Sequence, residues 1–148
     1  MIISSIVSYG KIQNLNWKKV FSELNISDVQ VAESSEFDLN VHFLDVGKAD
    51  CIYIKFKDHN ILIDAADNEP SPSVVEYLKR QGVSDFDLIV VSHPHRDHIG
   101  QMAEVINEFK VNKFLEPNIP EEFIPTGATY RKMLKALKNN NVNAELIK

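Results

Sequence analysis

Four residues with metal-binding side chains lie within six positions of one another: His93, His95, Asp97 and His98. In extended backbone, side chains two residues apart project to the same side, so the imidazoles of His93 and His95 can face one cation. Where the chain then bends into a helix, Asp97 and His98 become adjacent donors for a neighbouring position. The spacing therefore predicts two divalent ions held side by side, an arrangement that activates water for hydrolysis.

The residue types leave the identity of the metal open, because zinc, iron and manganese all accept imidazole and carboxylate. We expect zinc first, with manganese or iron as alternatives. Cys51 is the only cysteine, which excludes a zinc cage built from several thiolates. We expect Cys51 to be a half-buried apolar residue rather than a nucleophile. The alternative interpretation of this cluster is that its histidines bind no metal and only pack or form hydrogen bonds in a loop.

The elements that must position these residues follow from the apolar pattern. The run 88–91 is continuous and β-branched, which is typical of a strand covered on both faces, and it leads directly into His93. Upstream, alternation over 39–57 predicts a β-hairpin, and 61–64 predicts a short strand that ends on Asp64. The sequence thus brings two strand ends to the candidate site.

Helical spacing of apolar residues predicts three helices, over 71–81, 102–109 and 130–137. Further strands are predicted at 111–115 and 142–147. Strands that alternate with helices indicate an α/β layered fold with a mixed sheet.

The first 38 residues differ in pattern from the rest, and we predict two regions. Residues 1–38 form an N-terminal extension, with one short amphipathic helix behind Asn16 and a polar linker at 32–36. Residues 39–148 form the α/β domain.

The motif His-x-His-x-Asp-His after a buried strand resembles the metallo-β-lactamase superfamily, and the resemblance covers residues 39 to about 115. Three blocks, at 43–52, 61–65 and 92–100, are similar to the hydrolase domain of ComEC-type DNA-uptake proteins. That subgroup usually has Gly-Gln-Gly-Asp where this chain has Gly-Lys-Ala-Asp at 47–50. It often has an acidic residue where this chain has His95, a departure that favours two-metal chemistry here.

The resemblance implies a role for each residue of the motif. His93 and His95 would bind the first metal, and Asp97 and His98 the second, with Asp97 also orienting the attacking water. Asp64 would accept the other ring N–H of a ligand histidine, which fixes the tautomer of that histidine. The alternative for Asp64 is a turn or capping residue.

Two further acidic residues, Asp45 and Asp50, flank a glycine turn near the site in such proteins. They either line the site or simply form the turn, because Asp favours turns regardless of function.

The predicted function is a metal-dependent hydrolase that acts through activated water on a small-molecule or phosphodiester substrate such as DNA. The alternative is a catalytically silent metal-binding or interaction module. All five histidines lie at or before position 98, and no Asp follows Asp97, although a complete site of this kind takes ligands from further downstream. We therefore expect the N-terminal half of an αββα sandwich, inactive by itself, that self-associates through its uncovered sheet face.

Composition narrows the classes of partner. Lys and Arg number 16 against 21 Asp and Glu, a net charge of −5, which argues against a broad nucleic-acid-binding surface.

The apolar start at 1–7 is too short for a signal peptide, and we predict no membrane segment in this chain. The compartment is left open, with the cytoplasm as the default and an extracellular location if an export signal was removed.

Overall fold

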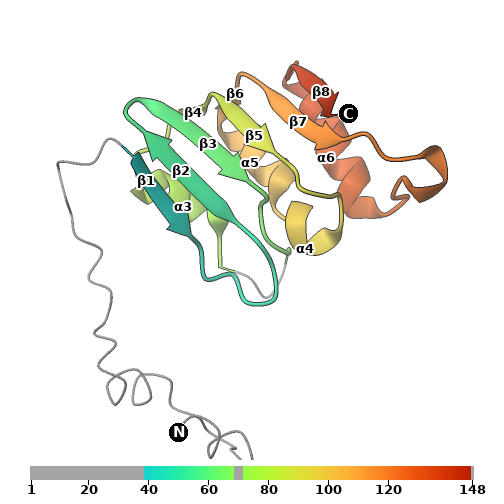
Figure 1. Ribbon diagram of the computed structural model, residues 1–148, viewed down its shortest axis with the longest axis horizontal. Helices are drawn as coiled ribbons and strands as arrows, with labels where there is room; N and C mark the ends of the chain where they lie inside the picture. Colours follow the sequence, from blue (N-terminus) through green and yellow to red (C-terminus); the bar gives the residue numbers. More distant parts are fainter. Residues whose placement is uncertain (1–38, 69–71, 148) are drawn as a thin grey trace, which may run out of the picture. The chain divides into compact units, whose positions relative to one another are not determined.

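The computed structural model describes residues 39–68 and 72–147. They form a six-stranded sheet with helices packed on one face (Figure 1). In spatial order the strands are β1 (Leu39–Phe43), β2 (Ile52–Phe56), β3 (His59–Ile63), β5 (Leu88–Val90), β7 (Phe114–Pro117) and β8 (Ala144–Ile147). A second sheet pairs β4 (Asp85–Phe86) with β6 (Lys110–Val111). The helices are α3 (Val74–Arg80), α4 (Arg96–Ile99), α5 (Met102–Glu108) and α6 (Ala128–Asn139), with a 3-10 turn η1 (Glu121–Phe123).

The six-stranded sheet is mixed, as the sequence predicted. Strands β1, β2 and β3 pair antiparallel, whereas β3, β5, β7 and β8 run parallel. Parallel neighbours need a long crossover, and helices lie in each of these connections. Because β3, β5, β7 and β8 all point the same way, their carboxyl ends meet at one edge of the sheet.

The face of the sheet that the helices cover, here called the inner face, holds the core. Tyr53, Leu62, Ile89 and Phe114 each have no exposed surface, and they come from four different strands. Full burial of such side chains contributes about 1.5–3 kcal/mol apiece. The described residues contain no helix that is long and apolar enough to cross a membrane.

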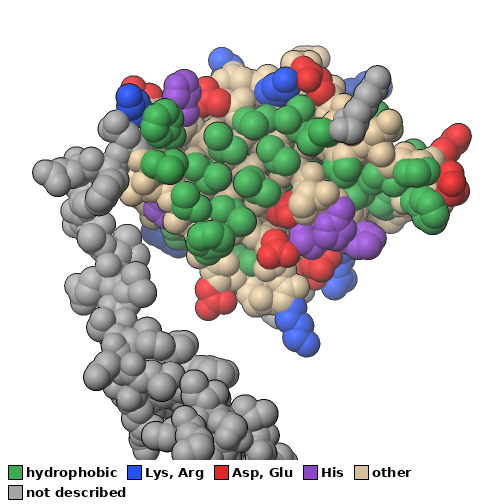
Figure 2. All heavy atoms as spheres, in the orientation of Figure 1, with side chains coloured by type: hydrophobic (Ala, Val, Ile, Leu, Met, Phe, Trp, Pro, Cys, Tyr) green, Lys and Arg blue, Asp and Glu red, His purple; other side chains and the backbone are tan. Residues whose placement is uncertain are grey.

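The opposite face, here called the outer face, carries no helix (Figure 1). Figure 2 views this face and shows hydrophobic side chains gathered over β1, β2, β3 and β5. Val41 and Phe43 on β1 keep 46% and 78% of their surface exposed. The alternate residue His42 points inward, and its Nδ1 lies 2.8 Å from the Tyr77 hydroxyl on α3. The histidine is therefore on the packed side of β1 and the large apolar residues are on the open side.

The predicted elements appear with shifted limits. The strand expected at 111–115 divides into β6 and β7, because its two ends have different partners. The N–H of Asn112 donates to the carbonyl of Phe86 in β4, whereas the carbonyl of Lys113 accepts from the N–H of Ile89 in the large sheet. Strand β4 and turn η1 were not predicted. The predicted N-terminal helix and linker lie outside the described residues.

Candidate metal centre

The candidate metal ligands lie between the end of β5 and the short helix α4. Strand β5 is anchored by the buried Ile89, and Val91 just beyond it is also buried. The chain then leaves the sheet at its carboxyl edge, where α/β folds bind ligands. Helix α4 begins at Arg96 with His95 as its N-cap residue in extended conformation. This change from strand to helix brings residues on both sides of the bend together.

Three of the predicted residues converge. One ligand atom from each of His93, Asp97 and His98 lies within 4.8 Å of the others. The Nε2 atom of His98 lies 3.7 Å from Asp97 Oδ2 and 3.6 Å from Asp50 Oδ2. These separations exceed a hydrogen bond and approach the roughly 3.4 Å between two ligands of one tetrahedral zinc. The donor set and its spacing therefore fit a divalent cation.

His95 occupies a different position from the other three. Its ring contacts that of His93 edge to face, with centroids 4.7 Å apart, and its side chain makes no cap hydrogen bond. The rings of His93 and His98 are closer, at 3.8 Å between centroids. The residues that converge thus come from both of the pairs predicted from sequence, and the division of ligands between two ions stays a prediction.

Asp64 lies directly behind His98. It follows β3, is only 3% exposed, and its Oδ2 is 2.8 Å from His98 Nδ1. The backbone N–H of Ser92 donates to Oδ1 at 2.8 Å, and the Ser92 hydroxyl donates to Oδ2 at 2.6 Å. With Nδ1 donating to a carboxylate, the lone pair of His98 is on Nε2, the atom that faces Asp97 and Asp50.

Ser92 was not singled out from the sequence, although it completes the hydrogen bonding of Asp64. The available signal was its position, between a buried strand and the first histidine. Asp64 also has a positive φ of 59°, a left-handed conformation that Asp tolerates better than most residues. The conformation is retained because the side chain accepts three hydrogen bonds at once.

Backbone hydrogen bonds tie the ligand-bearing segment to two distant loops. The N–H of Asp50 donates to the Asp97 carbonyl at 3.2 Å, and the N–H of Ala66 donates to the Asp50 carbonyl at 2.9 Å. The N–H of Ala65 donates to the His98 carbonyl at 2.7 Å. The loop before β2, the loop after β3 and the turn into α4 therefore hold one another in place.

Gly100 allows the closest of these approaches. A Cβ at this position would lie 2.3 Å from the carbonyl carbon of Asp67, a distance that no side chain tolerates. The N–H of Gly100 donates to the Ala66 carbonyl at 2.7 Å across this contact. Glycine is needed here for close packing between the end of α4 and the loop after β3.

Two further residues that the sequence analysis did not identify extend this support. The side chain of Gln101 is buried, accepts from the N–H of Val74, and donates to the carbonyls of Asp67 and Pro72. Arg96 forms a two-pronged ion pair with Asp67, with both N···O distances at 3.0 Å. A buried amide with three partners was detectable only from the structure.

Of the other residues that the sequence analysis considered, Asp50 lies beside the candidate ligands, whereas Asp45 and Cys51 do not take part in the site. Asp50 is exposed and faces His98, whereas Asp45 is exposed and lines a separate groove. Cys51 is 3% exposed, more buried than expected, and burial with the nearby Asp64 carboxylate raises the pKa of its thiol to about 12. A thiol that stays protonated is not a nucleophile.

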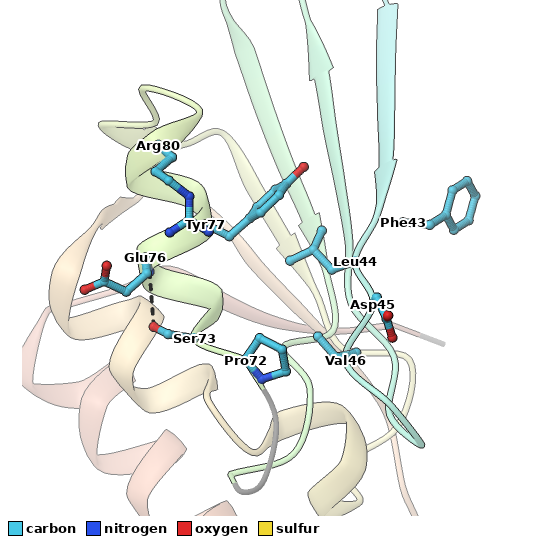
Figure 3. Close-up of a pocket in the computed structure, with 9 residues that line it drawn as sticks. All are labelled: Phe43, Leu44, Asp45, Val46, Pro72, Ser73, Glu76, Tyr77 and Arg80. Carbon is cyan, nitrogen blue, oxygen red and sulfur yellow. Dashed lines mark hydrogen bonds between the residues drawn. The ribbon is translucent and has the colours of Figure 1, made fainter. Parts of the chain in front are cut away.

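The separate groove has a volume of about 410 Å³ and lies between the end of β1 and α3. Figure 3 shows Leu44 and Tyr77 facing each other across it, while the ring of Phe43 lies on the far side of β1. The groove is lined by Phe43, Leu44, Asp45, Val46, Pro72, Ser73, Glu76, Tyr77 and Arg80. None of the metal-ligating candidates is among them.

The end of β5, the turn that carries His93, Asp97 and His98, and the buried carboxylate behind His98 form a group that could hold a metal ion. The sequence model of the Metallo-beta-lactamase superfamily matches residues 44–145, more than half of the chain. The chain belongs to the metallo-beta-lactamase superfamily. The expected family and the mixed α/β fold are thereby confirmed.

Two solved structures are similar to this chain over about three quarters of its length. An archaeal metallo-beta-lactamase superfamily protein from Sulfolobus tokodaii is 21% identical and covers 74% of this chain, with a TM-score of 0.46. A candidate metallo-beta-lactamase from Thermotoga maritima is 19% identical and covers 75%, with a TM-score of 0.50. This chain spans 44% and 58% of those two proteins.

Among curated proteins, the anaerobic nitric oxide reductase flavorubredoxin of Klebsiella pneumoniae is 34% identical over 55 residues. The match covers 36% of this chain and 11% of the reductase. The chain thus corresponds to a part of each of these three proteins.

Proposed function

We propose that this chain provides the metal-binding part of a hydrolase that uses a metal-activated water. The observation that carries the proposal is the convergence of His93, Asp97 and His98, with Asp64 behind His98. Membership of a superfamily that is generally hydrolytic supports the same reaction class.

The chemistry divides between the bound metal and the side chains. A divalent ion would supply Lewis acidity and lower the pKa of a coordinated water. The Asp97 side chain is 48% exposed, so its carboxylate can hold and orient a water that enters from solvent. Asp64 keeps the His98 ring in one tautomer and one orientation. Asp50 and Asp97 place negative charge on the solvent side of His98, which favours a cation.

We propose two divalent ions, with zinc favoured and manganese or iron as alternatives. His95 beside His93 gives a second imidazole for one ion, and Asp50 beside His98 gives a second carboxylate for the other. The proposal makes Asp50 a candidate ligand in addition to a turn residue.

A phosphodiester substrate, such as DNA, is proposed from the three ComEC-like blocks at 43–52, 61–65 and 92–100. The structure contributes a site open to solvent on the side of Asp97 and Asp50. An open site suits a large substrate better than an enclosed cavity would.

The test combines metal content with hydrolysis. Elemental analysis after dialysis against zinc should find about two ions per chain, and a His95→Ala/His98→Ala variant should lose them. His59→Ala is the matched control, because His59 is exposed and pairs with Asp87 away from the proposed ligands. Metal content that does not differ between the two variants would refute the assigned site.

The second candidate function is a metal-binding or interaction module without catalysis. It is favoured by the small ligand group, because only three residues of the described chain converge fully and an active zinc site normally has three protein ligands for each ion. Hydrolysis of bis(p-nitrophenyl) phosphate by the zinc-loaded chain, abolished in Asp97→Asn, supports the enzyme. Zinc bound at full occupancy with no turnover of that ester, or of a lactam or thioester, fits the module and equally fits a hydrolase of which this chain supplies only one half.

A further inference from the structure

We propose that the solvent-facing side of α6 binds the sugar–phosphate backbone of a nucleic acid. The proposal concerns binding and not the reaction at the metal centre, so it is independent of the proposed hydrolase function.

Positive charge is concentrated on α6, although the chain as a whole has a net charge of −5. This helix carries four basic residues and no acidic residue, and all four basic side chains are exposed. They are here called the basic stripe and consist of Arg131, Lys132, Lys135 and Lys138.

The helical period places most of the stripe along one line. Met133 and Leu137 are buried and therefore define the side of α6 that packs on the core. With 3.6 residues per turn, Arg131, Lys135 and Lys138 follow one another on the opposite side, separated by about one turn each. They extend over about 10 Å of helix at 1.5 Å per residue.

The stability of the helix does not account for this arrangement. Residues three and four apart on a helix are neighbours, and like charges at these separations destabilise it. Lys135 has one like charge four residues before it and one three residues away on each side. Arg131 lies near the N-terminal end, where the helix macrodipole is positive and disfavours cations. The stripe therefore opposes folding of α6 and becomes favourable when an anion binds to it.

Acidic side chains of the described part of the chain do not neutralise the stripe. The ion pairs of Lys and Arg in residues 39–68 and 72–147 lie elsewhere and are Lys79–Glu108, Arg96–Asp67 and Lys113–Glu145. Arg131 instead donates from Nη1 to the carbonyl of Thr126, which holds its side chain in place and leaves its charge uncompensated. Glu104 on α5 faces the same groove as two of the lysines but forms no ion pair with them.

A polar groove runs beside the stripe, between α5 and α6, which lie next to each other on the sheet (Figure 1). Lys132 and Lys135 line its first part, of about 330 Å³. The second part, of about 360 Å³, shares Asn107 with the first and adds Lys110. Four amide side chains complete the lining, and they are Asn107, Asn139, Asn140 and Asn141. Lysine and asparagine are among the side chains that bind phosphate and sugar oxygens of nucleic acids.

A nucleic-acid backbone fits this surface better than a membrane does. One strand of duplex DNA presents a phosphate about every 3.4 Å, so about three phosphates lie along the length of the stripe. A helix that lies on a membrane inserts apolar side chains next to its cations. On α6 the apolar side is buried against the core, and Leu134 is its one large apolar side chain that is exposed, at 40%. The acidic remainder of the chain repels phosphate, which confines the backbone to this surface.

Fluorescence anisotropy of a labelled DNA duplex of about 20 base pairs, titrated with the full 148-residue chain, tests the proposal. EDTA is present throughout, so the result does not depend on the metal centre. We expect equal affinity for duplexes of unrelated sequence, because phosphate contacts carry no sequence information. With four cations the affinity should fall about a hundredfold between roughly 50 and 200 mM salt.

A pair of double variants locates the binding surface. Lys132→Gln/Lys135→Gln should weaken binding about tenfold or more at low salt and reduce the slope of log affinity against log salt by about 2. Lys57→Gln/Arg80→Gln is the matched control. It removes the same charge from two exposed positions, the turn between β2 and β3 and the end of α3. It should keep the affinity within about twofold.

Thermal unfolding separates a binding role from a structural one. Gln forms helices about as well as Lys, and Lys132→Gln/Lys135→Gln removes repulsion between like charges, so this variant should melt at the same or a higher temperature than the wild type. A lower melting temperature would show that the lysines serve the fold and would overturn the proposal.

Three binding results would also overturn it. The first is no binding of the duplex by the wild type at low salt. The second is equal loss of affinity in the two double variants. The third is tighter binding to phosphatidylserine vesicles than to DNA, lost in Lys132→Gln/Lys135→Gln, which would make the stripe a membrane-binding surface.

Discussion

The two faces of the six-stranded sheet both carry large apolar residues but differ in burial. On the inner face, Leu62 and Phe114 have no exposed surface. On the outer face, Val41 and Phe43 of the edge strand remain 46% and 78% exposed. The residues come from the same sheet, so strand propensity does not separate them.

The difference teaches that helices, rather than strand sequence, decide which face is the core of this chain. The three longer helices lie between successive parallel strands and all pack on one side, as right-handed crossovers in one direction require. The other face keeps its apolar side chains without receiving cover from the described residues. Variants on the two faces should therefore behave very differently, and the comparison yields four predictions.

The largest contrast is expected between two phenylalanines. Phe114→Ala on the inner face should lower the free energy of unfolding by about 3–5 kcal/mol, because it leaves a cavity in the core. Phe43→Ala should change it by less than about 0.5 kcal/mol at concentrations where the chain is monomeric. Urea denaturation measures both values. Equal losses at the two positions would show that the outer face is also a stabilising core in the monomer.

The second prediction tests whether the loops around the candidate metal centre are packed as tightly as the inner face of the sheet. Gly100→Ala should destabilise the fold by about 1–3 kcal/mol, because the new Cβ collides with the Asp67 backbone. Gly127→Ala is the control, since a Cβ there meets no atom within 4 Å. Thermal unfolding compares the two. A Gly100→Ala variant as stable as the control would mean that this loop moves freely.

A third prediction concerns affinity rather than stability. Asp64→Asn replaces the carboxylate that receives the His98 Nδ1 proton, so zinc should bind about 10- to 100-fold more weakly. Asp58→Asn, in the exposed turn between β2 and β3, should leave zinc affinity unchanged. Calorimetric titration with zinc gives both constants. Unchanged affinity in Asp64→Asn would show that Asp64 only stabilises the loop through Ser92.

The smallest effect contrasts two glutamates in neighbouring strands. Burial raises the pKa of Glu116 above its ordinary value of 4.5, and its Oε2 atom has no hydrogen-bond partner. Glu145 is exposed, and its hydrogen bond with Lys113 lowers its pKa. Because the folded state holds the Glu116 proton more tightly than the unfolded state, this residue makes stability fall as the pH rises above 4.5.

Glu116→Gln should therefore be more stable than the wild type at neutral pH, and this difference should vanish below pH 4.5. Denaturant midpoints at pH 4 and pH 7 measure it, with Glu145→Gln as the exposed control. A Glu116→Gln variant that is less stable at pH 7 would mean that the charged carboxylate has a partner in solution.

The sequence predicted the fold to a considerable extent, because the elements around the site have strong local signals. The apolar run before His93 and the alternation on both sides of Gly47 were sufficient for the mixed sheet and the hairpin. The spacing of the motif was sufficient to locate the cluster, but it grouped His93 with His95, whereas the structure brings His93 to Asp97 and His98.

Other features depend on contacts between distant residues and carry no local signal. Gln101 has an ordinary place in a helical pattern, yet its amide connects Val74 with Asp67. The outward orientation of Phe43 could not be predicted either. Alternating apolar and polar residues in β1 indicate that the two faces of the sheet differ, but they do not indicate which face the helices cover. The division of one expected strand at Asn112 likewise follows from its two partners.

The hydrogen bonds that join Asp50, Ala65, Ala66 and the turn at Asp97 and His98 have a kinetic consequence. They connect three stretches of chain about 15 and 30 residues apart in sequence, so the loop closures that bring them together must precede the native geometry of the histidines. A short synthetic peptide of the motif alone would not have this geometry. Cation binding at the proposed site would consequently depend on tertiary assembly, and zinc should bind during refolding only after the first three strands have paired with β5.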